Sequence, residues 1–283
     1  MLLSTLKEIV AKKKEQNIPD FVINNFLKEY LQYPVLAYIY SHKKYKNLIF
    51  IGGSCLRVCY NLPRLSEDLD FDYFKKDFAK IDLEIFANDL KKYFKNNYLI
   101  DVNIKTQASI RIYLKFPILK NLGLASNISE SDFLYVKIEI SKSNFVKPET
   151  NLIPISKFGY NFIAKNYTLE YLMTGKINAI LNRVWFKGSS NEINVKGRDF
   201  YDLYWYLQNK ISPNWAELEK TAGIKTQDEF VKVIKEKIEK NVSAKKLAYD
   251  LKNFFENQEF VNNFCENYKN IVYKNLEAAF NQK

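Results

Sequence analysis

Three aspartates alternate along one short segment of the chain and could hold a metal ion. Asp68, Asp70 and Asp72 occupy every second position of the segment Asp68–Tyr73. Side chains of a β-strand alternate between its two faces, so the three carboxylates are expected on the same side. Neighbouring carboxylates repel one another unless a cation lies between them, and Mg²⁺ is usually bound by one or two carboxylates together with substrate phosphates. The pattern therefore predicts a magnesium site with Asp68 and Asp70 as ligands.

A glycine-rich turn precedes the acidic segment and could bind phosphate. Gly52, Gly53 and Ser54 follow the apolar run 48–51, which is typical of a buried strand. Glycines let a ligand approach the backbone closely, and the first N–H groups of the following helix are unpaired at the positive end of its dipole. Each motif alone is common in plain turns and solvent-exposed strand ends, so chance pairing is the alternative. Together, the motifs predict a site for a nucleoside triphosphate and its metal.

These residues also resemble a known family. Gly52, Gly53 and Ser54, followed by the string Arg-Leu-Ser-Glu-Asp-Leu-Asp-Phe at 64–71, are similar to the first motif of the AbiEii/AbiGii toxin family. That family is a bacterial branch of the polymerase-β-like nucleotidyltransferase superfamily. A second block, at 176–183 and 196–203, resembles the family's downstream helices, in which a lysine binds the triphosphate and an Arg-Asp-x-x-Asp pattern follows. The resemblance extends over residues 48–207.

The resemblance implies a specific reaction and specific partners. A nucleoside monophosphate (NMP) would be transferred from a nucleoside triphosphate (NTP) to an acceptor, and pyrophosphate would be released. Asp68 and Asp70 would hold two Mg²⁺ ions, with Mn²⁺ as a substitute. Family members act as toxins of type IV toxin–antitoxin or abortive-infection systems, and some modify the acceptor end of tRNA. The expected partners are therefore an NTP, RNA with the tRNA 3′ end as the favoured acceptor, and a cognate antitoxin.

A third catalytic carboxylate is expected from a neighbouring strand. In the superfamily it acts as the base or as a ligand of the catalytic metal. Glu139 is the leading candidate, because it alternates in phase with Tyr135 and Lys137, away from the apolar face of the strand predicted at 134–140. Asp101 is the fallback. An ordinary solvent-exposed strand glutamate is the alternative interpretation of Glu139.

Basic residues of the second block could neutralise the triphosphate. Lys176 and Arg183 are seven residues apart, so both project from one face of a helix. Cations there would stabilise charge that develops on the leaving pyrophosphate, although exposed helix faces and helix C-termini also favour cations. Arg198 and Asp199 begin the next helix, and the resemblance assigns them to the active site, with Asp199 orienting Lys176 or Arg198. Alternatively, Arg198 and Asp202 form an ordinary i,i+4 ion pair.

Composition bears on the partner and the compartment. Lys and Arg outnumber Asp and Glu by 43 to 32, and the net charge of +11 favours a polyanionic partner such as RNA. A lysine-rich composition also follows from an AT-rich genome. The sequence has no apolar run long enough to span a membrane, and lysines at 7 and 12–14 interrupt any signal-like segment. The three cysteines lack metal-ligand spacing, so a cytoplasmic protein without a membrane anchor is expected.

The predicted elements form two lobes, as the length of 283 residues suggests. The expected fold is α/β (α+β), with a polymerase-β-like mixed sheet and flanking helices at 1–150 and a helical domain at 151–283 that completes an active-site cleft. Residues 143–166 are predicted to be a connection. Strands are predicted at 48–51, 68–73, 99–105, 110–116 and 134–140, and helices at 3–14, 20–40, 81–96, 169–183, 197–208, 214–221, 227–240, 243–255 and 258–280.

Two other functional classes stay open from the sequence. A nucleotidyltransferase that modifies small molecules, such as antibiotics, would share the first motif but should present an acidic pocket to its cationic substrates. A non-catalytic nucleotide-binding or nucleic-acid-binding module on the same fold would lack at least one metal carboxylate, whereas Asp68 and Asp70 are both present.

Overall fold

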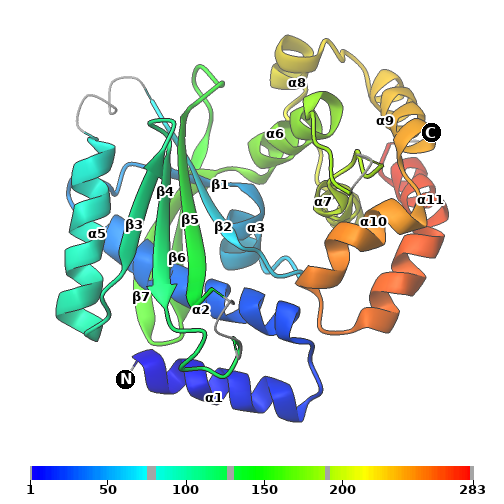
Figure 1. Ribbon diagram of the computed structural model, residues 1–283. Coiled ribbons are helices and arrows are strands. Elements are labelled where there is room, and N and C mark those ends of the chain that lie inside the picture. Colours follow the sequence, from blue (N-terminus) through cyan, green and yellow to red (C-terminus); the bar gives the residue numbers. More distant parts are fainter. Residues whose placement is uncertain (1, 75–80, 126–130, 189–191, 281–283) are drawn as a thin grey trace. The chain divides into compact units, whose positions relative to one another are not determined.

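The computed structural model describes residues 2–74, 81–125, 131–188 and 192–280 (Figure 1). The chain divides into two compact units. The first unit comprises Met1–Val146 and Thr150–Asn166, and the second comprises Lys147–Glu149 and Tyr167–Lys283.

A mixed sheet forms the core of the first unit. Its strands are β1 (Ile49–Ile51), β2 (Asp68–Tyr73), β3 (Asn103–Gln107), β4 (Arg111–Pro117), β5 (Phe133–Lys142), β6 (Thr150–Lys157) and β7 (Tyr160–Tyr167). Their spatial order is β3-β4-β5-β2-β1-β7-β6. β2 lies between β1, which is antiparallel to it, and β5, which is parallel to it. The acidic segment therefore occupies a central strand.

Helices α2 (Asp20–Ser41), α3 (Gly52–Tyr60) and α5 (Leu83–Tyr98) pack against this sheet, and α1 (Leu2–Glu15) packs on α2. Asp82 caps the N-terminus of α5, because its side chain accepts hydrogen bonds from the backbone N–H groups of Glu84 and Ile85. α5 packs against β3 and β4. α2 contacts β5, and α3 follows β1 directly and packs on β2 (Figure 1).

Period-two alternation separates the two faces of the sheet. On β4 and β5 the buried residues are Ile112, Leu114, Phe116, Leu134, Val136, Ile138 and Ile140. The residues between them project from the opposite face and are polar or aromatic. Thr106 of β3 bonds to Glu84 of α5 through its hydroxyl, 2.6 Å from the carboxylate, so α5 lies on the buried face. The polar face is the one that carries the candidate site.

The predicted connection at 143–166 is wrong. β6 and β7 form there and belong to the first unit, so the sheet continues beyond β5 and residues 151–166 are not part of the helical region. The prolines favoured a loop, but Pro154 is tolerated because β6 is an edge strand. The strand predicted from residue 99 begins later, at Asn103, because Leu99 ends α5 with a left-handed φ of 57°.

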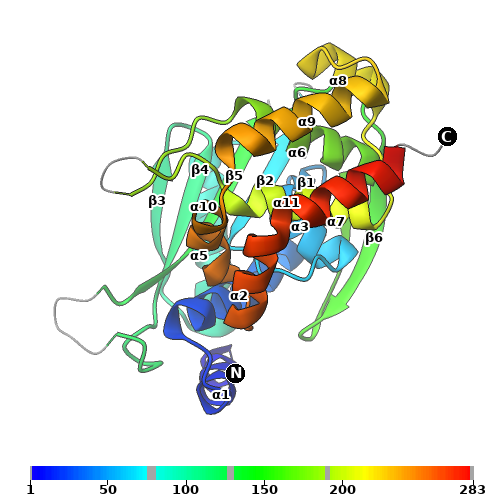
Figure 2. The same ribbon diagram turned by 90° about the vertical axis from the view of Figure 1, so that its right-hand side faces the viewer.

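The second unit is helical, as predicted. Its helices are α6 (Leu169–Asn182), α7 (Gly197–Gln208), α8 (Trp215–Ala222), α9 (Gln227–Asn241), α10 (Ala244–Leu251), the short 3₁₀ helix η1 (Lys252–Phe254) and α11 (Gln258–Phe280). α7 is central and contacts α6, α10 and α11 (Figure 2). A Cβ on Gly197 would lie 2.6 Å from the carbonyl oxygen of Leu247, so the close approach of α7 to α10 requires glycine. No helix in the described ranges is long and apolar enough to cross a membrane.

Candidate active site

The turn after β1 brings the backbone of Gly52 close to the carboxylate of Asp70. Gly52 has a left-handed φ of 75°, which disfavours any residue with a side chain. A Cβ placed on Gly52 would lie 2.7 Å from Oδ2 of Asp70. The pairing of Ile51 with Asp70 across β1 and β2 produces this contact. The second aspartate of Asp-x-Asp therefore lies against the glycine turn.

A buried arginine lies below the same turn. Nη2 of Arg64 occupies the space that a Cβ on Gly53 would fill. The Arg64 side chain is buried, and its Nη1 donates to the carbonyl oxygen of Leu65 at 2.9 Å. The guanidinium adds positive charge at the N-terminus of α3, where unpaired N–H groups and the helix dipole already favour an anion. Arg64 is the first residue of the motif string 64–71, and no role for it was predicted from the sequence.

Ser54 is buried, and its hydroxyl is engaged within the protein. Its Oγ donates to the backbone oxygen of Asp68 and lies 2.9 Å from Oγ of Ser66. These bonds fasten α3 to the start of β2 and so fix the distance between the turn and the aspartates. The group that Ser54 can offer to a phosphate is its backbone N–H. Triphosphate binding by Ser54 stays a prediction.

Strand register gathers the predicted carboxylates on the polar face of the sheet. Asp70 is the direct neighbour of Glu139 across β2 and β5, and Asp68 is the neighbour of Lys137. Nζ of Lys137 lies 2.9 Å from Oδ2 of Asp68 and 3.6 Å from Oε2 of Glu139. Glu139 also accepts a 2.7 Å hydrogen bond from Nε of Arg111. Asp68, Asp70 and Glu139 therefore lie together, with cations between and beside them.

These cations set the charge of Glu139. Burial raises the pKa of Glu139, but the hydrogen bond from Arg111 and the charge of Lys137 outweigh burial and leave the pKa below its ordinary value. Burial lowers the pKa of Lys137, but the charge and hydrogen bond of Asp68 raise it by more, so the pKa lies above its ordinary value. Glu139 is consequently ionised at neutral pH. A carboxylate with a low pKa is a weak general base, so the environment suits a charged ligand better than a proton acceptor.

The carboxylates Asp68, Asp70 and Glu139 fit a Mg²⁺ ion that substrate phosphates also help to bind. Across the described ranges, no group of three or more His, Cys, Asp or Glu residues could hold a metal ion alone. One or two carboxylates suffice when phosphates supply further oxygens. Asp68 already binds a cation, the ammonium of Lys137 at 2.9 Å, so this position of the sheet accommodates positive charge.

Asp101, the fallback third carboxylate, lies elsewhere. It precedes β3, is exposed, and forms an ion pair with Lys95 of α5 at 2.8 Å. Glu139, in contrast, is the strand neighbour of Asp70. The geometry favours Glu139.

The second unit gathers Lys176 and Arg183 around the buried carboxylate of Asp199. Nζ of Lys176 lies 2.8 Å from Oδ1 of Asp199 and 2.8 Å from Oδ2 of Asp202. Arg183, which ends α6, places Nη1 3.1 Å from the other oxygen of Asp199. Burial raises the pKa of Asp199, but the charges of Lys176, Arg183 and Lys196 lower it far more. Asp199 thus joins Lys176 and Arg183.

Arg198 has a different partner from the one that its spacing suggested. Its Nε lies 3.2 Å from Oδ2 of Asp250, and the same oxygen accepts from its backbone N–H at 2.9 Å. The guanidinium also lies 4.0 Å from the ring centroid of Phe254. These contacts fasten α7 to α10 and η1, while Asp202 pairs with Lys176.

Lys196, at the start of α7, is a cation without a matching carboxylate. Burial and the charge of Arg198 lower its pKa to about 8, against a smaller opposing effect of Asp199. Its Nζ forms no ion pair or hydrogen bond with any residue that the structure describes. The cation cluster, as we call it below, comprises four basic residues, Lys176, Arg183, Lys196 and Arg198, around three acidic ones, Asp199, Asp202 and Asp250. One positive charge is in excess, which suits a bound anion.

A model of the AbiEii nucleotidyl transferase toxins of type IV toxin–antitoxin systems matches residues 35–272. The chain belongs to this family. The match confirms the resemblance seen in the motifs, and membership implies an NTP as substrate and an antitoxin as partner. No curated protein matches the sequence.

Two solved structures are similar to this AbiEii family member. MenT4, a nucleotidyltransferase toxin from Mycobacterium tuberculosis, is 12% identical with a TM-score of 0.55, and the match covers 95% of this chain and 88% of MenT4. JHP933 from Helicobacter pylori is 18% identical with a TM-score of 0.46, covering 90% and 94% of the two chains. The likeness to MenT4 confirms the nucleotidyltransferase fold.

Three cations near the motif were not predicted from the sequence: Arg64, Lys137 and Arg111. Arg64 belongs to the motif string 64–71, so its position could have indicated a role in the site. Lys137 shares the phase of Glu139, and that alternation could have marked it as a neighbour of the aspartates. Arg111 gave no signal, because its position beside Glu139 depends on the register between β4 and β5.

Proposed function

We propose that this AbiEii family member transfers an NMP from an NTP to an RNA acceptor, with the 3′ end of tRNA as the favoured site, and releases pyrophosphate. The observation that carries the proposal is the contact between Asp70 and the Gly52 turn, where a Cβ would lie 2.7 Å from the carboxylate. A predicted metal ligand and a phosphate-binding backbone thus meet at one point. A protein that bound nucleic acid without chemistry would not need this arrangement.

Asp68 and Asp70 are the proposed metal ligands. Two Mg²⁺ ions, or Mn²⁺ in their place, would activate the acceptor hydroxyl and stabilise the charge on the leaving pyrophosphate when bound. The N–H groups of Gly52, Gly53 and Ser54 would bind phosphate oxygens, aided by the dipole of α3. Glu139, ionised and next to Asp70, is proposed as the third carboxylate, acting through its charge and as a weak acceptor of the hydroxyl proton.

The cation cluster of the second unit is proposed to bind the triphosphate. Arg183 is exposed, and Asp199 holds it and Lys176 in place. The unpaired Lys196 supplies the excess charge. Cations held in place by carboxylates need little reorganisation when charge develops on pyrophosphate. Arg198, fastened to Asp250, supports the start of α7 and adds to the positive field.

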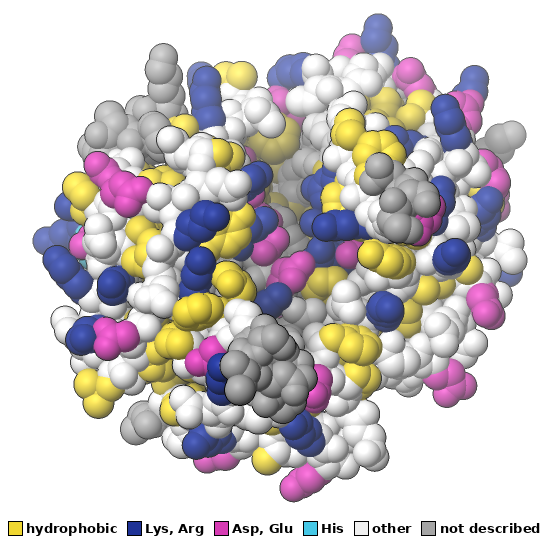
Figure 3. Space-filling view, viewed as in Figure 1, with side chains coloured by type: hydrophobic (Ala, Val, Ile, Leu, Met, Phe, Trp, Pro, Cys, Tyr) yellow, Lys and Arg dark blue, Asp and Glu magenta, His cyan; other side chains and the backbone are white. Residues whose placement is uncertain are grey.

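The net charge supports a polyanionic acceptor. Lys and Arg side chains are spread over the face seen in Figure 3, interspersed with acidic and hydrophobic ones. Such a distribution gives sequence-independent attraction to a phosphate backbone, which weakens as salt rises. Sequence-independent attraction leaves the choice of acceptor to groups near the carboxylates.

The test incubates purified protein with each labelled NTP, Mg²⁺ and total RNA, and then with protein extract. The expected result is label at the 3′ end of RNA, declining strongly from low to physiological salt, while NTP affinity declines less because its contacts are local. Asp70→Asn is the matched control and should transfer nothing. Label on protein or on a small cationic molecule, with all RNA unmodified, would refute the RNA acceptor and leave the transfer chemistry standing.

A further inference from the structure

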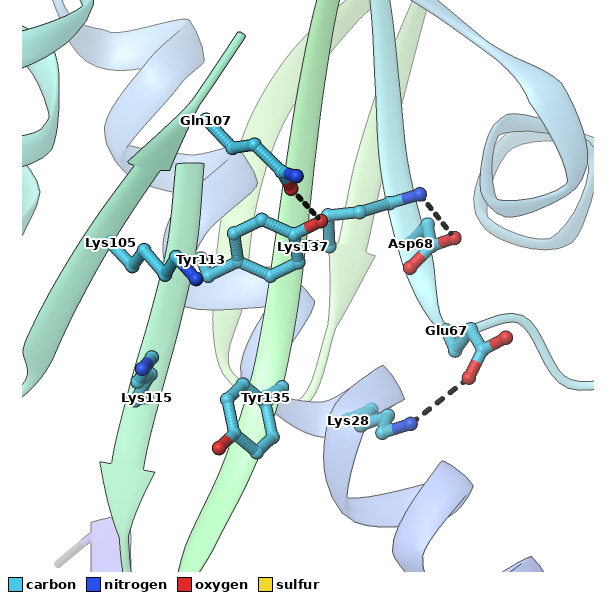
Figure 4. A pocket seen from close by; sticks show the side chains of 9 residues that line it. All are labelled: Lys28, Glu67, Asp68, Lys105, Gln107, Tyr113, Lys115, Tyr135 and Lys137. Atoms are coloured by element: carbon cyan, nitrogen blue, oxygen red, sulfur yellow. Dashed lines mark hydrogen bonds and ion pairs between the residues drawn. The ribbon is translucent and has the colours of Figure 1, made fainter. Parts of the chain in front are cut away.

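A pocket of about 460 Å³ opens beside Asp68 on the polar face of the sheet (Figure 4). It lies entirely within the first unit. Its walls come from the start of β2, from β3, β4 and β5, and from α2. The side chains that matter below are four lysines and two tyrosines: Lys28, Lys105, Lys115, Lys137, Tyr113 and Tyr135.

Strand register puts the pocket in line with the proposed metal site. Asp68 neighbours Lys137 on β5, Lys137 neighbours Tyr113 on β4, and Tyr113 neighbours Lys105 on β3. These four side chains therefore form one row across four strands, which spans about 14 Å at the usual strand spacing. Tyr135 and Lys115 are direct neighbours in an adjacent row. A ligand that lies along the first row would end at Asp68.

Two of the four lysines lack acidic partners. Lys137 pairs with Asp68 at 2.9 Å, and Lys28 pairs with Glu67 at 3.0 Å. Lys105 and Lys115 form no ion pair with any residue in the described part of the chain. Nζ of Lys115 lies 5.7 Å from the ring centroid of Tyr135 instead. The pocket thus carries two uncompensated positive charges next to exposed aromatic surface.

We propose that this pocket binds the single-stranded 3′ end of the nucleic-acid acceptor. Phosphates contact Lys105 and Lys115, a base stacks on Tyr135, and the terminal hydroxyl is directed to Asp68. The inference rests on the proposed function, because it names the acceptor subsite of the same reaction. Proteins that bind single-stranded nucleic acid without sequence preference use unpaired lysines for the phosphates and aromatic side chains for the bases.

The pocket's chemistry argues against the other acceptors. A cationic small molecule would be repelled by Lys105 and Lys115. An intact duplex keeps its bases stacked inside, so it could not use Tyr135, which is 39% exposed. The volume lies in the range of pockets that enclose a ligand of about nucleotide size.

The test measures binding of a 5′-fluorescein single-stranded RNA of mixed sequence by anisotropy over a range of salt concentrations. The variants are Lys105→Gln/Lys115→Gln and Tyr135→Leu. The control Lys91→Gln/Lys92→Gln removes the same charge from exposed positions on α5, away from the pocket. Asp70→Asn separates binding from chemistry.

Each phosphate contact of a single strand contributes about 0.7 to the slope of log affinity against log salt, so loss of the two lysines should reduce this slope by about 1.4. Extrapolated from 1 M salt, this is a loss of roughly 25-fold in affinity at 0.1 M salt. Tyr135→Leu should weaken binding roughly tenfold with an unchanged slope. Asp70→Asn should bind RNA as the wild type does and transfer nothing.

Equal affinity and slope for Lys105→Gln/Lys115→Gln and the α5 control would overturn the pocket, as would a wild-type protein that binds no single-stranded RNA. A duplex probe that loses as much affinity in Tyr135→Leu as the single strand would also overturn it. RNA binding through the pocket without NMP transfer would refute the proposed function alone. Transfer to RNA that the pocket variants leave undiminished would refute the pocket alone.

Discussion

The affinity of this protein for an NTP should fall about tenfold between pH 7 and pH 9, because of Lys196. Burial and the charges of Arg198, Arg183 and Lys176 lower its pKa to about 8, although Asp199 opposes them. Without ligand, Lys196 is therefore mostly charged at pH 7 and mostly neutral at pH 9. A triphosphate prefers the charged form.

The magnitude follows from the pKa. A bound triphosphate favours the ammonium and should return the pKa of Lys196 towards its ordinary 10.5. In the free protein, a pKa of about 8 gives a charged fraction of roughly 0.9 at pH 7 and 0.1 at pH 9. The binding constant scales with that fraction, so it changes about tenfold, or about 1.4 kcal/mol. The terminal phosphate has a pKa near 6, so its own charge changes little over this range.

The stability of the unliganded protein should change in the opposite direction. The folded-state pKa of Lys196 lies below its unfolded value of 10.5, so the unfolded chain binds more protons between about pH 8 and pH 10.5. In that window the free energy of unfolding rises with pH, and below it the buried ammonium lowers the free energy of unfolding by its full amount. Lys196→Met removes this destabilisation. Its Tm should exceed that of the wild type at pH 7, and the difference should narrow as pH approaches 10.

The assay is calorimetric titration of a non-hydrolysable NTP analogue with Mg²⁺ at pH 7, 8 and 9, in buffers of different ionisation enthalpy. The wild type should take up a proton on binding near pH 9, whereas Lys196→Met should bind more weakly at pH 7 and show no pH dependence. Lys245→Met, at an exposed position of α10, is the control and should behave as the wild type. A tenfold fall that persists in Lys196→Met, or none in the wild type, would refute the assignment.

Three other variants test the proposed metal ligand, the buried ion pairs and the glycine turn. Asp70→Asn should abolish NMP transfer with an unchanged circular dichroism spectrum, and near-normal transfer would contradict its role as a metal ligand. Lys176→Ala should lower the free energy of unfolding by about 3–5 kcal/mol, because Asp199 and Asp202 stay buried without their ammonium; an unchanged Tm in a scanning calorimeter would show that the ion pairs contribute nothing. Gly52→Ala should weaken Mg²⁺-dependent NTP binding, since it strains a φ of 75° and displaces Asp70; wild-type affinity by calorimetry would exclude a close fit at the turn.

The parts of the fold that the sequence predicts well carry strong periodic signals. β2 and α7 have the predicted bounds, 68–73 and 197–208. In β2, apolar and acidic residues alternate without interruption, and α7 begins at a glycine that packing against α10 requires. Such signals are local, so they survive without knowledge of the rest of the chain.

The hairpin of β6 and β7 could not be predicted in the same way. Its strands lie at one end of the sheet, where only part of each strand is buried, and Leu152 and Ile163 are exposed. Alternation is weak on such a surface, and Pro148 and Pro154 suggested a loop. What holds the hairpin is its pairing of β7 with β1, which lies over a hundred residues earlier in the chain.

The candidate site shows the same difference between local sequence signals and long-range contacts. The aspartates and the glycine turn are recognisable because each motif is contiguous. Arg111, the cation beside Glu139, is not, because it reaches Glu139 only through the register of β4 with β5. The double pairing of Lys176 likewise depends on the packing of α6 against α7.

β5 links the proposed metal site and the proposed acceptor pocket. Along its polar face, Tyr135, Lys137 and Glu139 follow one another at every second position, so one strand presents an aromatic ring, a cation and a carboxylate in line. Apolar side chains between them, such as Val136 and Ile138, are fully buried. A slip of one residue would turn all three polar groups into the core, so burial of the apolar face fixes their positions. The hydrophobic effect that holds the sheet together therefore also sets the spacing on which the proposed chemistry depends.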